Sequence, residues 1–397
     1  MNVRRVVVLD HTGQLGGAEI ALQRLLLAID DSWDVSVLLF SDGPFRRALE
    51  ESGVRVDVLT MPDRTAAQSR GGLGDPRVLR AASADSIAFA KSLAQRISAM
   101  GADLVVANSL KAAVVAELSS WRTRLPWVWH LHDRLSADYL PPHAVATMRL
   151  LARRASHVVA NSGAVAALTA LPPRRLTVAY PGLPKASFSD RRVERARPVF
   201  GLLGRISSTK GQQEFIEAAA LVERKIPDAR FRVVGDALFS DLSYASHVRR
   251  LPTQLGLGDK IEFTGWAEDP AAALDGFGVL VHASPVPEPF GQVIVEGMAR
   301  CVPVIATQGG GVGEILMAPP ASLPAGAFLT TPVGRMVMPR DVEALASAMV
   351  AAIVHSARSS DLAHAAQTRA AQAFSIETTA QAATRVWLKQ IRSDGLG

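Results

Sequence analysis

Short apolar runs, rich in β-branched residues, alternate with alanine-rich stretches along nearly the whole chain. Runs that are apolar at every position are typical of strands buried on both faces of a parallel sheet. Because strand and helix patterns alternate, we predict an α/β fold with helices on both faces of parallel sheets. The expected strands are Val6–Leu9, Val35–Phe40, Val54–Leu59, Leu104–Ala107, Trp127–Leu131, His157–Ala160, Leu176–Ala179, Val199–Leu203, Arg230–Val234, Ile261–Thr264, Val279–His282 and Val302–Ala306.

The pattern breaks between Gly182 and Pro198. That segment is polar and charged and is closed by proline, as is typical of a linker between domains. A chain of 397 residues also favours a division into two, since domains usually hold about 100–200 residues. We expect one domain over residues 1–185 and a second over 198–375, each with its own sheet. Ligands of such sheets bind at the carboxyl ends of the strands, so two facing sheets would form a cleft.

Composition excludes several classes of protein. With 48% hydrophobic and 20% charged residues, the chain is globular. Its one cysteine, Cys301, excludes a disulfide framework and any multi-cysteine metal site. No apolar run reaches the roughly 18 residues that span a bilayer, and the apolar stretch before Asp10 is too short for a signal peptide. A cytoplasmic location is therefore expected.

The net charge of +6 (43 basic against 37 acidic residues) favours anionic ligands or an anionic membrane surface. Nucleic acid is not expected as a partner, because no basic run is interleaved with aromatic residues. Dinucleotides and ATP lose support as well, because neither a GxGxxG fingerprint nor a GxxxxGKS/T phosphate loop occurs.

The most informative motif is EPFGQVIVEGMARCVPVIAT, residues 288–307, followed by GGGVGE at 309–314. Glu288 and Glu296 lie eight residues apart, around a Phe-Gly turn and the start of an apolar helix. A carboxylate accepts two hydroxyl hydrogen bonds at once, so the pair suits a ligand rich in vicinal diols. A glycine turn after a strand, opening onto a helix N-terminus, suits a phosphate. Sugar and phosphate together indicate a sugar nucleotide.

Two further loops follow predicted strands and precede predicted helices. Gly16 and Gly17 let the backbone approach a ligand closely beside free helix N–H groups, although a double glycine can equally serve a tight turn. Arg205 and Lys210 suit a clamp for a pyrophosphate at a helix start. Their charges oppose the helix dipole there, which makes a merely solvated position the weaker interpretation.

A histidine pair lies at the end of the strand Trp127–Leu131. His130 and His132 alternate with apolar residues, so both are expected on the same side of the sheet. His132, followed by Asp133, lies where the strand meets the cleft and can orient a sugar hydroxyl, whereas His130 lies one pleat deeper and is expected in the core. A zinc site is not expected, because no further His or Cys cluster completes it.

Together these motifs resemble the retaining glycosyltransferases of the GT-B fold, in particular the large family 4 (glycosyl transferases group 1). The resemblance covers nearly the whole chain, in order: LGGAE, HD after a mid-domain strand, ANS at 160–162, YPGLP, GRISSTKG, VVGDA, FTGW, EPFGQVIVEGMARCVPVIAT and GGGVGEI. It implies two Rossmann-like domains facing across a cleft, with an acceptor-binding domain over 1–185 and a donor-binding domain over 198–375. The run 376–391 resembles the family's last helix, which packs back on the first domain.

The resemblance also implies roles for single residues. It implies that the backbone of Gly16 and Gly17 contacts the donor phosphate, and that Arg205 and Lys210 neutralise the leaving pyrophosphate. Glu288 and His132 would contact the donor sugar, and Glu296 would contact the ribose. The backbone N–H groups of Phe290 and Gly291 would lie beside the sugar and the phosphate. Catalytic roles would thus fall to His132, Glu288, Arg205 and Lys210. The donor would be a nucleotide-sugar, with UDP- and GDP-sugars favoured, and neither a cofactor nor a metal is expected.

The implied reaction has no covalent intermediate. The acceptor hydroxyl attacks from the face that the nucleotide leaves, through an oxocarbenium-like state, and the departing phosphate takes its proton. The implied products are polysaccharides, glycolipids or glycosides of small molecules. Rival interpretations are an epimerase or hydrolase of similar fold and a catalytically inactive sugar-nucleotide-binding protein.

The acceptor could be lipid-linked or soluble. Segment 143–157 is a predicted basic helix with Arg149, Arg153 and Arg154, and family members that act on lipid-linked acceptors bind membranes through such helices. Peripheral contact with the inner membrane face is therefore one interpretation, and a solvated helix face is the other. Residues 62–80 form a long polar connection, expected to be a lid or an acceptor-binding loop. The asparagine usual before glycine at the linker motif is Pro181 here.

Overall fold

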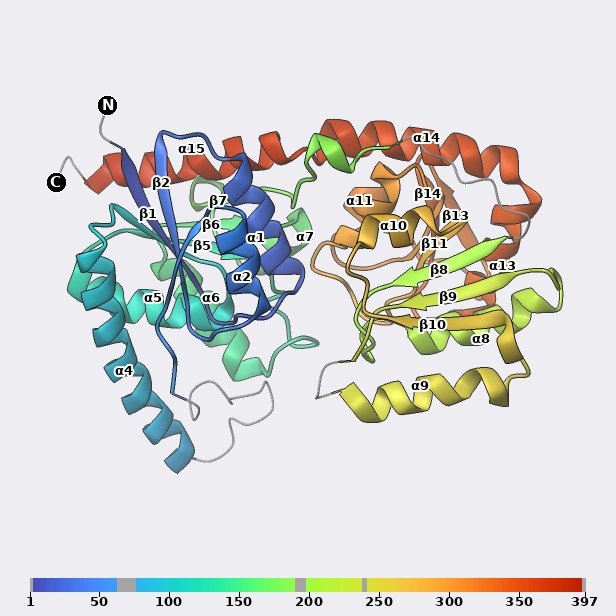
Figure 1. Cartoon of the computed structure of the whole chain (residues 1–397), viewed down its shortest axis with the longest axis horizontal. Coiled ribbons are helices and arrows are strands. Elements are labelled where there is room, and N and C mark those ends of the chain that lie inside the picture. The colour runs from blue at the N-terminus through green and yellow to red at the C-terminus, as the bar shows by residue number, and fades with distance from the viewer. Residues whose placement is uncertain (1–2, 63–75, 190–197, 238–240, 395–397) are drawn as a thin grey trace. The chain divides into compact units, whose positions relative to one another are not determined.

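The structure, a computed structural model, describes residues 3–62, 76–189, 198–237 and 241–394 (Figure 1). The chain divides into two compact units, Met1–Gly182 with Ile376–Gly397 (unit 1) and Leu183–Ser375 (unit 2). Each unit has its own sheet and its own hydrophobic core.

Unit 1 contains a parallel sheet of seven strands in the order β3-β2-β1-β4-β5-β6-β7. Its strands are β1 (Arg4–Asp10), β2 (Trp33–Leu39), β3 (Arg55–Val58), β4 (Leu104–Ala107), β5 (Trp127–Leu131), β6 (His157–Ala160) and β7 (Leu176–Val178). Its helices are α1 (Gly17–Ala28), α2 (Pro44–Glu51), α4 (Pro76–Ala99), α5 (Leu110–Thr123), α6 (Pro142–Arg154), α7 (Gly163–Leu168) and α15 (Ile376–Asp394).

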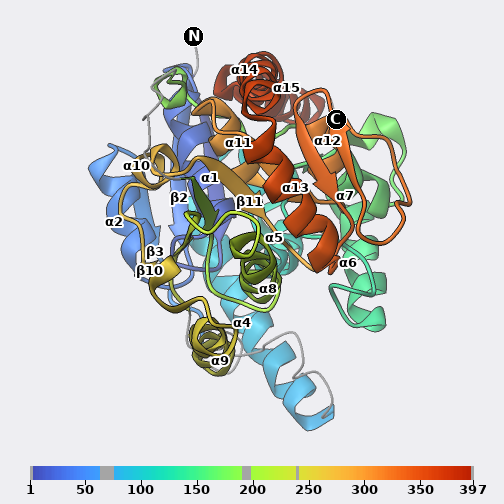
Figure 2. The same ribbon diagram turned by 90° about the vertical axis from the view of Figure 1, so that its right-hand side faces the viewer.

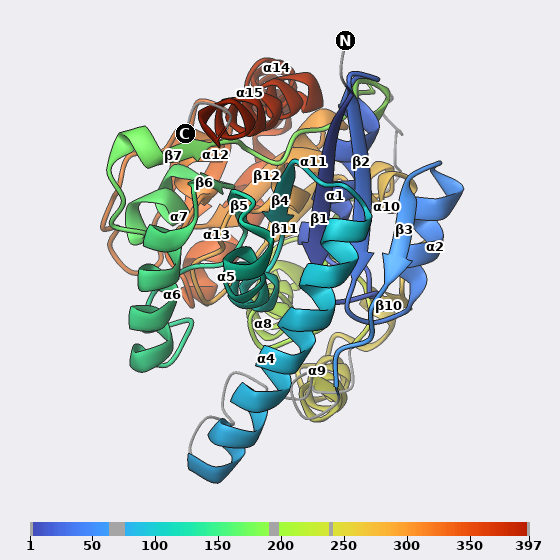
Figure 3. The same cartoon turned by 90° about the vertical axis from the view of Figure 1, so that its left-hand side faces the viewer.

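Alternate residues of the strands serve different faces of this sheet, which Figure 3 shows with its helices. Val7 and Leu9 of β1 lie in a core with residues of α4, α5, α6 and α7. Val6 and Val8 point to the other face and pack in a core with residues of α1, α2 and α15. The same alternation in β5 brings both histidines of the strand's end to the cavity beside α1 and α15.

Unit 2 contains a second sheet of seven strands in the order β10-β9-β8-β11-β12-β14-β13, seen from its side in Figure 2. Its strands are β8 (Val199–Leu203), β9 (Arg230–Val234), β10 (Ile261–Gly265), β11 (Val279–His282), β12 (Val304–Thr307), β13 (Phe328–Thr331) and β14 (Gly334–Val337), and β13 alone of these runs antiparallel to its neighbour. Its helices are α8 (Gln212–Glu223), α9 (Leu242–Gln254), α10 (Pro270–Asp275), α11 (Gln292–Ala299), α12 (Val312–Leu316), α13 (Val342–Val354) and α14 (Ser356–Ala373). One core joins the sheet to α8, α9 and α13.

The predicted α/β class is confirmed, because both sheets are dominated by parallel strands that alternate with helices. All expected strands are present, with ends that differ by at most two residues. The hairpin β13–β14 was not expected: its strands are four residues each, joined by Pro332 and Val333, and such short runs show no clear periodicity. Of the long connection at 62–80, residues 63–75 lie outside the described part of the chain, and α4 begins at Pro76.

Both sheets have a point where the strand order changes direction, between β1 and β4 in unit 1 and between β8 and β11 in unit 2. The loops that leave two such strands diverge and open a crevice, where ligands of α/β sheets bind. The ends of these strands carry polar residues, namely Asp10, Asn108, Arg205 and His282. A functional site is therefore expected at this edge of each sheet.

Candidate active site

In unit 2, the loops after β8 and β11 bring a cation and a carboxylate into contact. Lys210 directly precedes Gly211, the N-cap of α8, and Glu288 lies in the loop between β11 and α11. Lys210 Nζ donates a hydrogen bond to Glu288 Oε1 over 2.6 Å, and the Glu288 side chain is only 12% exposed. Two residues predicted to serve one ligand, 78 positions apart in the chain, thus form an ion pair.

Glu288 stays ionised at all ordinary pH values. Burial alone would raise its pKa, but the Lys210 ammonium and His282 outweigh burial and lower the pKa of Glu288 to about 2. His282 ends β11, is buried, and places Nε2 at 3.6 Å from Glu288 Oε1. Glu288 is therefore a fixed negative charge, suited to accepting hydrogen bonds from hydroxyl groups and unsuited to donating a proton.

The loop that carries Glu288 is held by its neighbours. Ser284 Oγ donates to the carbonyl of Thr209 over 2.6 Å, which ties this loop to the one that carries the lysine. The glycine-rich turn contacts the same loop, since the Gly311 N–H donates to the Glu288 carbonyl over 3.0 Å. A Cβ atom on Gly310 would lie 1.7 Å from that carbonyl oxygen. This glycine is thus required by close packing, whatever ligand the turn binds.

The other predicted donor-site residues of unit 2 lie close in sequence to Lys210 or to Glu288. Arg205 follows β8, has an exposed side chain, and forms no ion pair with a described residue. Gly291 is the N-cap of α11 in the left-handed conformation (φ 109°), and Glu296 lies half-buried in the second turn of that helix. The buried ring of Phe290 packs edge-on against Phe374, with 5.6 Å between ring centres. That contact anchors the start of α11.

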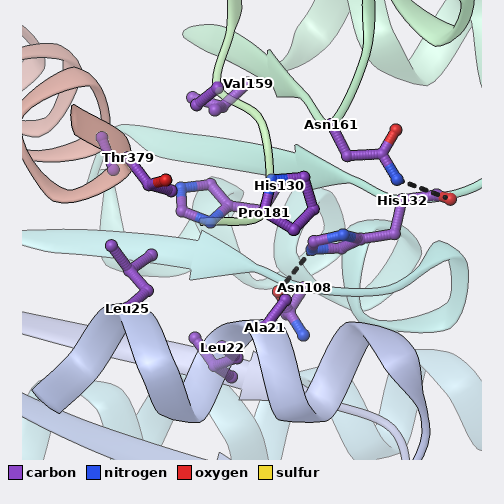
Figure 4. A pocket seen from close by; sticks show the side chains of 12 residues that line it. Ala21, Leu22, Leu25, Asn108, His130, His132, Val159, Asn161, Pro181 and Thr379 are labelled. Carbon is purple, nitrogen blue, oxygen red and sulfur yellow. Dashed lines mark hydrogen bonds between the residues drawn. The ribbon is translucent and has the colours of Figure 1, made fainter. Parts of the chain in front are cut away.

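In unit 1, hydrogen bonds connect the ends of four neighbouring strands, β1, β4, β5 and β6, in part visible in Figure 4. Asn108 Nδ2 donates to Asp10 Oδ2 over 2.7 Å, and Asn108 Oδ1 lies 3.0 Å from His132 Nε2. Asn161 Nδ2 donates to the backbone carbonyl of His132 over 3.3 Å. Asn108, His132 and Asn161 line a cavity of about 30 Å³, which is large enough for a water molecule or a hydroxyl group.

His130, one pleat deeper, is part of the core. Trp387 Nε1 donates to His130 Nε2 over 3.2 Å, and the two rings stack with centres 5.7 Å apart. Burial, with a smaller effect of His132, lowers the pKa of His130 to about 3, so its ring is neutral.

Gly16 and Gly17 lie at the start of α1, close to Glu19, a buried acid of the LGGAE motif to which the sequence assigned no role. Gly16 is the N-cap and Gly17 the first residue of the helix. Glu19 is 7% exposed, and burial together with the neighbouring Asp10 raises its pKa to about 7. Asp10, His11 and Glu19 each place one potential ligand atom within 4.8 Å of the others, the one such group for a metal ion in the described part of the chain.

Several polar residues of these sites were given no role from the sequence, although the ANS motif contains Asn161. Asp10, Asn108, Asn161 and His282 each end or directly follow a buried parallel strand. A polar residue at the end of an apolar run, repeated on neighbouring strands, is the signal that could have found them, because the carboxyl ends of such strands meet at one edge. Glu19, the acid of the LGGAE motif, does not follow a strand, and an acid in the first turn of a helix is common.

Two family models match the chain, one in each unit. Residues 16–182 match the glycosyl transferase 4-like domain, and residues 186–367 match the glycosyl transferases group 1. Lipopolysaccharide core biosynthesis glycosyltransferase LpsE of Rhizobium meliloti is 32% identical over 29% of this chain and 31% of its own length. A D-inositol 3-phosphate glycosyltransferase of Segniliparus rotundus is 30% identical over 40% of this chain and 38% of its own. The chain thus matches well under half the length of these curated relatives.

Solved structures match over nearly the whole chain. Anabaena HepE in complex with UDP-glucose is 28% identical, with a TM-score of 0.80 over 97% of this chain and 99% of that one. Sucrose-phosphate synthase from Thermosynechococcus elongatus shares the fold at 19% identity, with a TM-score of 0.75 over 98% of this chain and 100% of that one. With both domain models matched in order on two Rossmann-like units, the chain belongs to the family 4-type glycosyltransferases of the GT-B fold.

Proposed function

We propose that this protein transfers a sugar from a nucleotide-sugar donor to a hydroxyl group of an acceptor. The observation that carries the proposal is the ion pair of Lys210 and Glu288 beside the change of strand order in unit 2. A carboxylate with a pKa of about 2 offers permanent acceptors for sugar hydroxyls, and the adjacent ammonium offers a counter-charge for a phosphate. The acceptor for the sugar and the cation for the phosphate are thereby held in direct contact.

A UDP-sugar is the favoured donor, and a GDP-sugar is the alternative. HepE, 28% identical over 97% of this chain, binds UDP-glucose. A GDP-mannose-dependent mannosyltransferase of Mycolicibacterium smegmatis is 29% identical, but over only 39% of this chain, so the longer match favours uridine. Glu296 would accept bonds from the ribose hydroxyls, Arg205 would join the lysine at the diphosphate, and the backbone at Gly16, Gly17, Phe290 and Gly291 would supply N–H donors.

The proposed reaction retains the configuration of the sugar without a covalent intermediate. As the bond from sugar C1 to the diphosphate oxygen breaks, its electron pair goes to that oxygen, whose growing charge Lys210 and Arg205 neutralise. The acceptor oxygen attacks C1 from the same face and gives its proton to the departing phosphate. Glu288 and His132 hold the sugar's hydroxyl groups, which fixes the orientation of C1. A carboxylate engaged by Lys210 is a poor nucleophile, which supports attack by the acceptor itself.

Unit 1 is proposed to take the acceptor, lipid-linked or soluble. In the basic segment 143–157, Arg149 donates to two backbone carbonyls over 2.9 and 3.2 Å, and Arg154 donates to Glu117 over 2.8 Å. Two of the segment's arginines thus have internal partners, which weakens the case for a membrane-binding face. Among the described residues, no helix combines the length and the apolar character needed to cross a bilayer.

The donor is tested by a thermal-shift screen against UDP, GDP, ADP and dTDP. A nucleotide at about a hundred times its Kd adds about 2.7 kcal/mol to the free energy of unfolding, which is readily visible. We expect UDP to stabilise the wild type and also Glu288→Ala, which loses a sugar contact and the ion pair with Lys210 but keeps both cations for the diphosphate, and to leave Glu296→Ala unshifted. Transfer from UDP-glucose to simple hydroxyl acceptors should then be abolished in Glu288→Ala.

Four results would contradict parts of this proposal. Release of nucleotide without a transferred sugar would indicate a hydrolase or epimerase, and binding without turnover would indicate an inactive binding protein. Full activity of Glu288→Ala would remove the site assignment. A product of inverted configuration would exclude the retaining mechanism.

The transfer is also proposed to need no metal ion. Addition of EDTA should leave the rate unchanged, because Lys210 and Arg205 supply the positive charge at the diphosphate. A loss of activity that Mg²⁺ or Mn²⁺ restores would contradict this and would make Asp10, His11 and Glu19 the first residues to substitute.

A further inference from the structure

The two asparagines beside His132 are oriented by groups that only accept hydrogen bonds. The carboxylate of Asp10 has no hydrogen to donate, so the NH2 group of Asn108 faces it, at 2.7 Å. The backbone carbonyl of His132 likewise only accepts, so the NH2 group of Asn161 faces that oxygen, at 3.3 Å. Neither amide can turn over without losing its bond.

Asp10 keeps the accepting role that orients Asn108. Its Oδ1 accepts from the Thr12 N–H over 3.3 Å while Oδ2 accepts from Asn108, so both of its oxygens are acceptors. These two contacts keep the NH2 group of Asn108 facing Asp10.

The orientation of Asn108 decides which nitrogen of His132 carries the proton. With its NH2 group on Asp10, Asn108 presents its oxygen to His132 Nε2, 3.0 Å away. Two acceptors cannot share a hydrogen bond, so Nε2 must be protonated. Burial lowers the pKa of His132 against the opposing effects of Asp133 and Asp10, so the ring is neutral and Nδ1 carries a lone pair.

Two hydrogen-bond acceptors beside this cavity are left without a donor. In Figure 4, His132 lies between Asn108 and Asn161. His132 Nδ1 and Asn161 Oδ1 are both buried, and neither has a hydrogen-bond partner among the residues that the structure describes. A buried acceptor without a donor is unfavourable, because it has lost its hydrogen bonds to water. Two of them at one cavity indicate a ligand that brings hydrogens with it.

We propose that Asp10 and Asn108 are positioning residues that lock His132 with its proton on Nε2, so that Nδ1 and Asn161 Oδ1 accept hydrogen bonds from hydroxyl groups of the bound sugar. The lock, by which we mean the single tautomer imposed on His132, depends on residues of unit 1 alone. That the hydroxyl groups belong to a sugar rests on the proposed function. Groups that only accept, such as a fluorine or a carbonyl in place of the hydroxyl, should bind poorly, because the two buried acceptors would stay unpaired.

The lock is tested by ¹⁵N NMR of the full chain labelled with ¹⁵N-histidine, with His132 assigned from the His132→Gln variant. In the ligand-free protein we expect Nε2 to show the shift and one-bond hydrogen coupling of a protonated ring nitrogen, and Nδ1 the shift of a bare one. The ring of His130 should show the opposite tautomer in the same spectrum, because its Nε2 accepts from the indole N–H of Trp387. A wild-type His132 with the proton on Nδ1, on both nitrogens or exchanging between them would overturn the proposal.

Variants separate the positioning role from general damage to the cavity. Asn108→Ala and Asp10→Ala should each free the ring of His132 from its single tautomer, which averages the two ring shifts and speeds the exchange of the Nε2 hydrogen with solvent. Asn161→Ala is the matched control, because Asn161 bonds the backbone carbonyl of His132 and not its ring. Unchanged ring shifts in Asn108→Ala, or the same averaging in Asn161→Ala, would refute the positioning role.

The ligand half of the proposal is read from the same resonances. UDP-glucose, but not UDP, should shift His132 Nδ1 toward the value of a hydrogen-bonded acceptor, and Asn108→Ala should lower turnover at saturating donor about tenfold, as for one lost hydrogen bond. Binding of UDP-glucose without any change at Nδ1 would overturn this half. A protein that binds no nucleotide at all would contradict both the proposed function and the proposed contact with the sugar. The spectra without ligand would still decide whether His132 is held in one tautomer.

Discussion

Glu288 and Glu19 are the same type of side chain, both buried, and burial leaves them with opposite properties. In unit 2 the ammonium of Lys210 holds the pKa of Glu288 at about 2, so this carboxylate is a fixed charge. In unit 1 Glu19 has a carboxylate, Asp10, as its neighbour, and its pKa rises to about 7. The neighbour of Glu288 lies 78 positions away in the chain, and the burial that mainly raises the pKa of Glu19 comes from the packing of unit 1, so no local motif predicts the difference.

The variant Glu19→Gln should stabilise the protein in a pH-dependent way. The pKa of Glu19 rises from 4.5 when unfolded to about 7 when folded, so the folded state binds the proton more tightly. The stability that this proton contributes is present at acid pH and is lost as the pH rises from 4.5 to about 7. Glutamine has no such loss, so Tm of the variant should exceed that of the wild type by several degrees at about pH 8 and match it at about pH 4. A difference that does not depend on pH would contradict this.

The variant Lys210→Met should destabilise unit 2 more than a double variant in which Lys210 and Glu288 are both replaced. It leaves the carboxylate of Glu288 buried without a counter-charge, which costs about 2–3 kcal/mol once allowance is made for the partly exposed lysine, whose side chain is 34% exposed. The double variant Lys210→Met/Glu288→Gln should recover most of the loss in urea unfolding. In the wild type the pair's contribution is present above about pH 4.5 and is lost as the pH falls toward about 2. A double variant no more stable than the single one would refute the assignment.

At the scale of elements, the sequence predicts each piece of the fold that buries a continuous apolar run. Strands such as β4 (Leu104–Ala107) are recognisable because both their faces are covered. The hairpin β13–β14 was missed because its strands are short and Thr330 and Thr331 break the apolar run. The alternation along β5 was enough to bring both histidines to one cavity, but the link from Asn108 to His132 depends on the register of β4 against β5 and could not be predicted.

The glycine turn at 309–311 is an element whose role the sequence predicted only in part. A phosphate-binding turn was expected, and the structure adds a packing reason, since a Cβ on Gly310 would lie 1.7 Å from the Glu288 carbonyl oxygen. Gly310→Ala should therefore displace the loop of Glu288, cost about 2 kcal/mol or more, and abolish transfer.

Gly256→Ala is the matched control for that variant. Gly256 has φ 73°, close to the 61° of Gly310, but nothing lies within 4 Å of the Cβ that alanine would add. Gly256→Ala should lose only the stability that backbone strain costs, about 1 kcal/mol, and should keep full activity. Equal losses of stability and activity in the two variants would show that strain, not the contact with Glu288, explains the need for glycine.

At the scale of the whole molecule, the last helix completes a unit that the first residues begin. Unit 1 consists of residues 1–182 and 376–397, with unit 2 between them in sequence. Trp387 of α15 is fully buried in unit 1, stacks on His130 and meets Trp33 edge-on with 5.6 Å between ring centres. The core beneath α1 therefore lacks its largest side chain until the end of the chain has been made.

The variant Trp387→Ala should weaken unit 1 and spare unit 2. Removing a fully buried tryptophan costs about 3–5 kcal/mol, and its ring contacts lie within unit 1, beside β5. Hydrogen exchange should therefore rise in the peptide of β5 (Trp127–Leu131) and stay unchanged in that of β9 (Arg230–Val234), whose core contains no residue of α15. Trp121→Ala, in the same unit but 72% exposed, should change neither peptide. Faster exchange in both peptides would show that the two units unfold as one, and no change in β5 would show that α15 is dispensable to the sheet it covers.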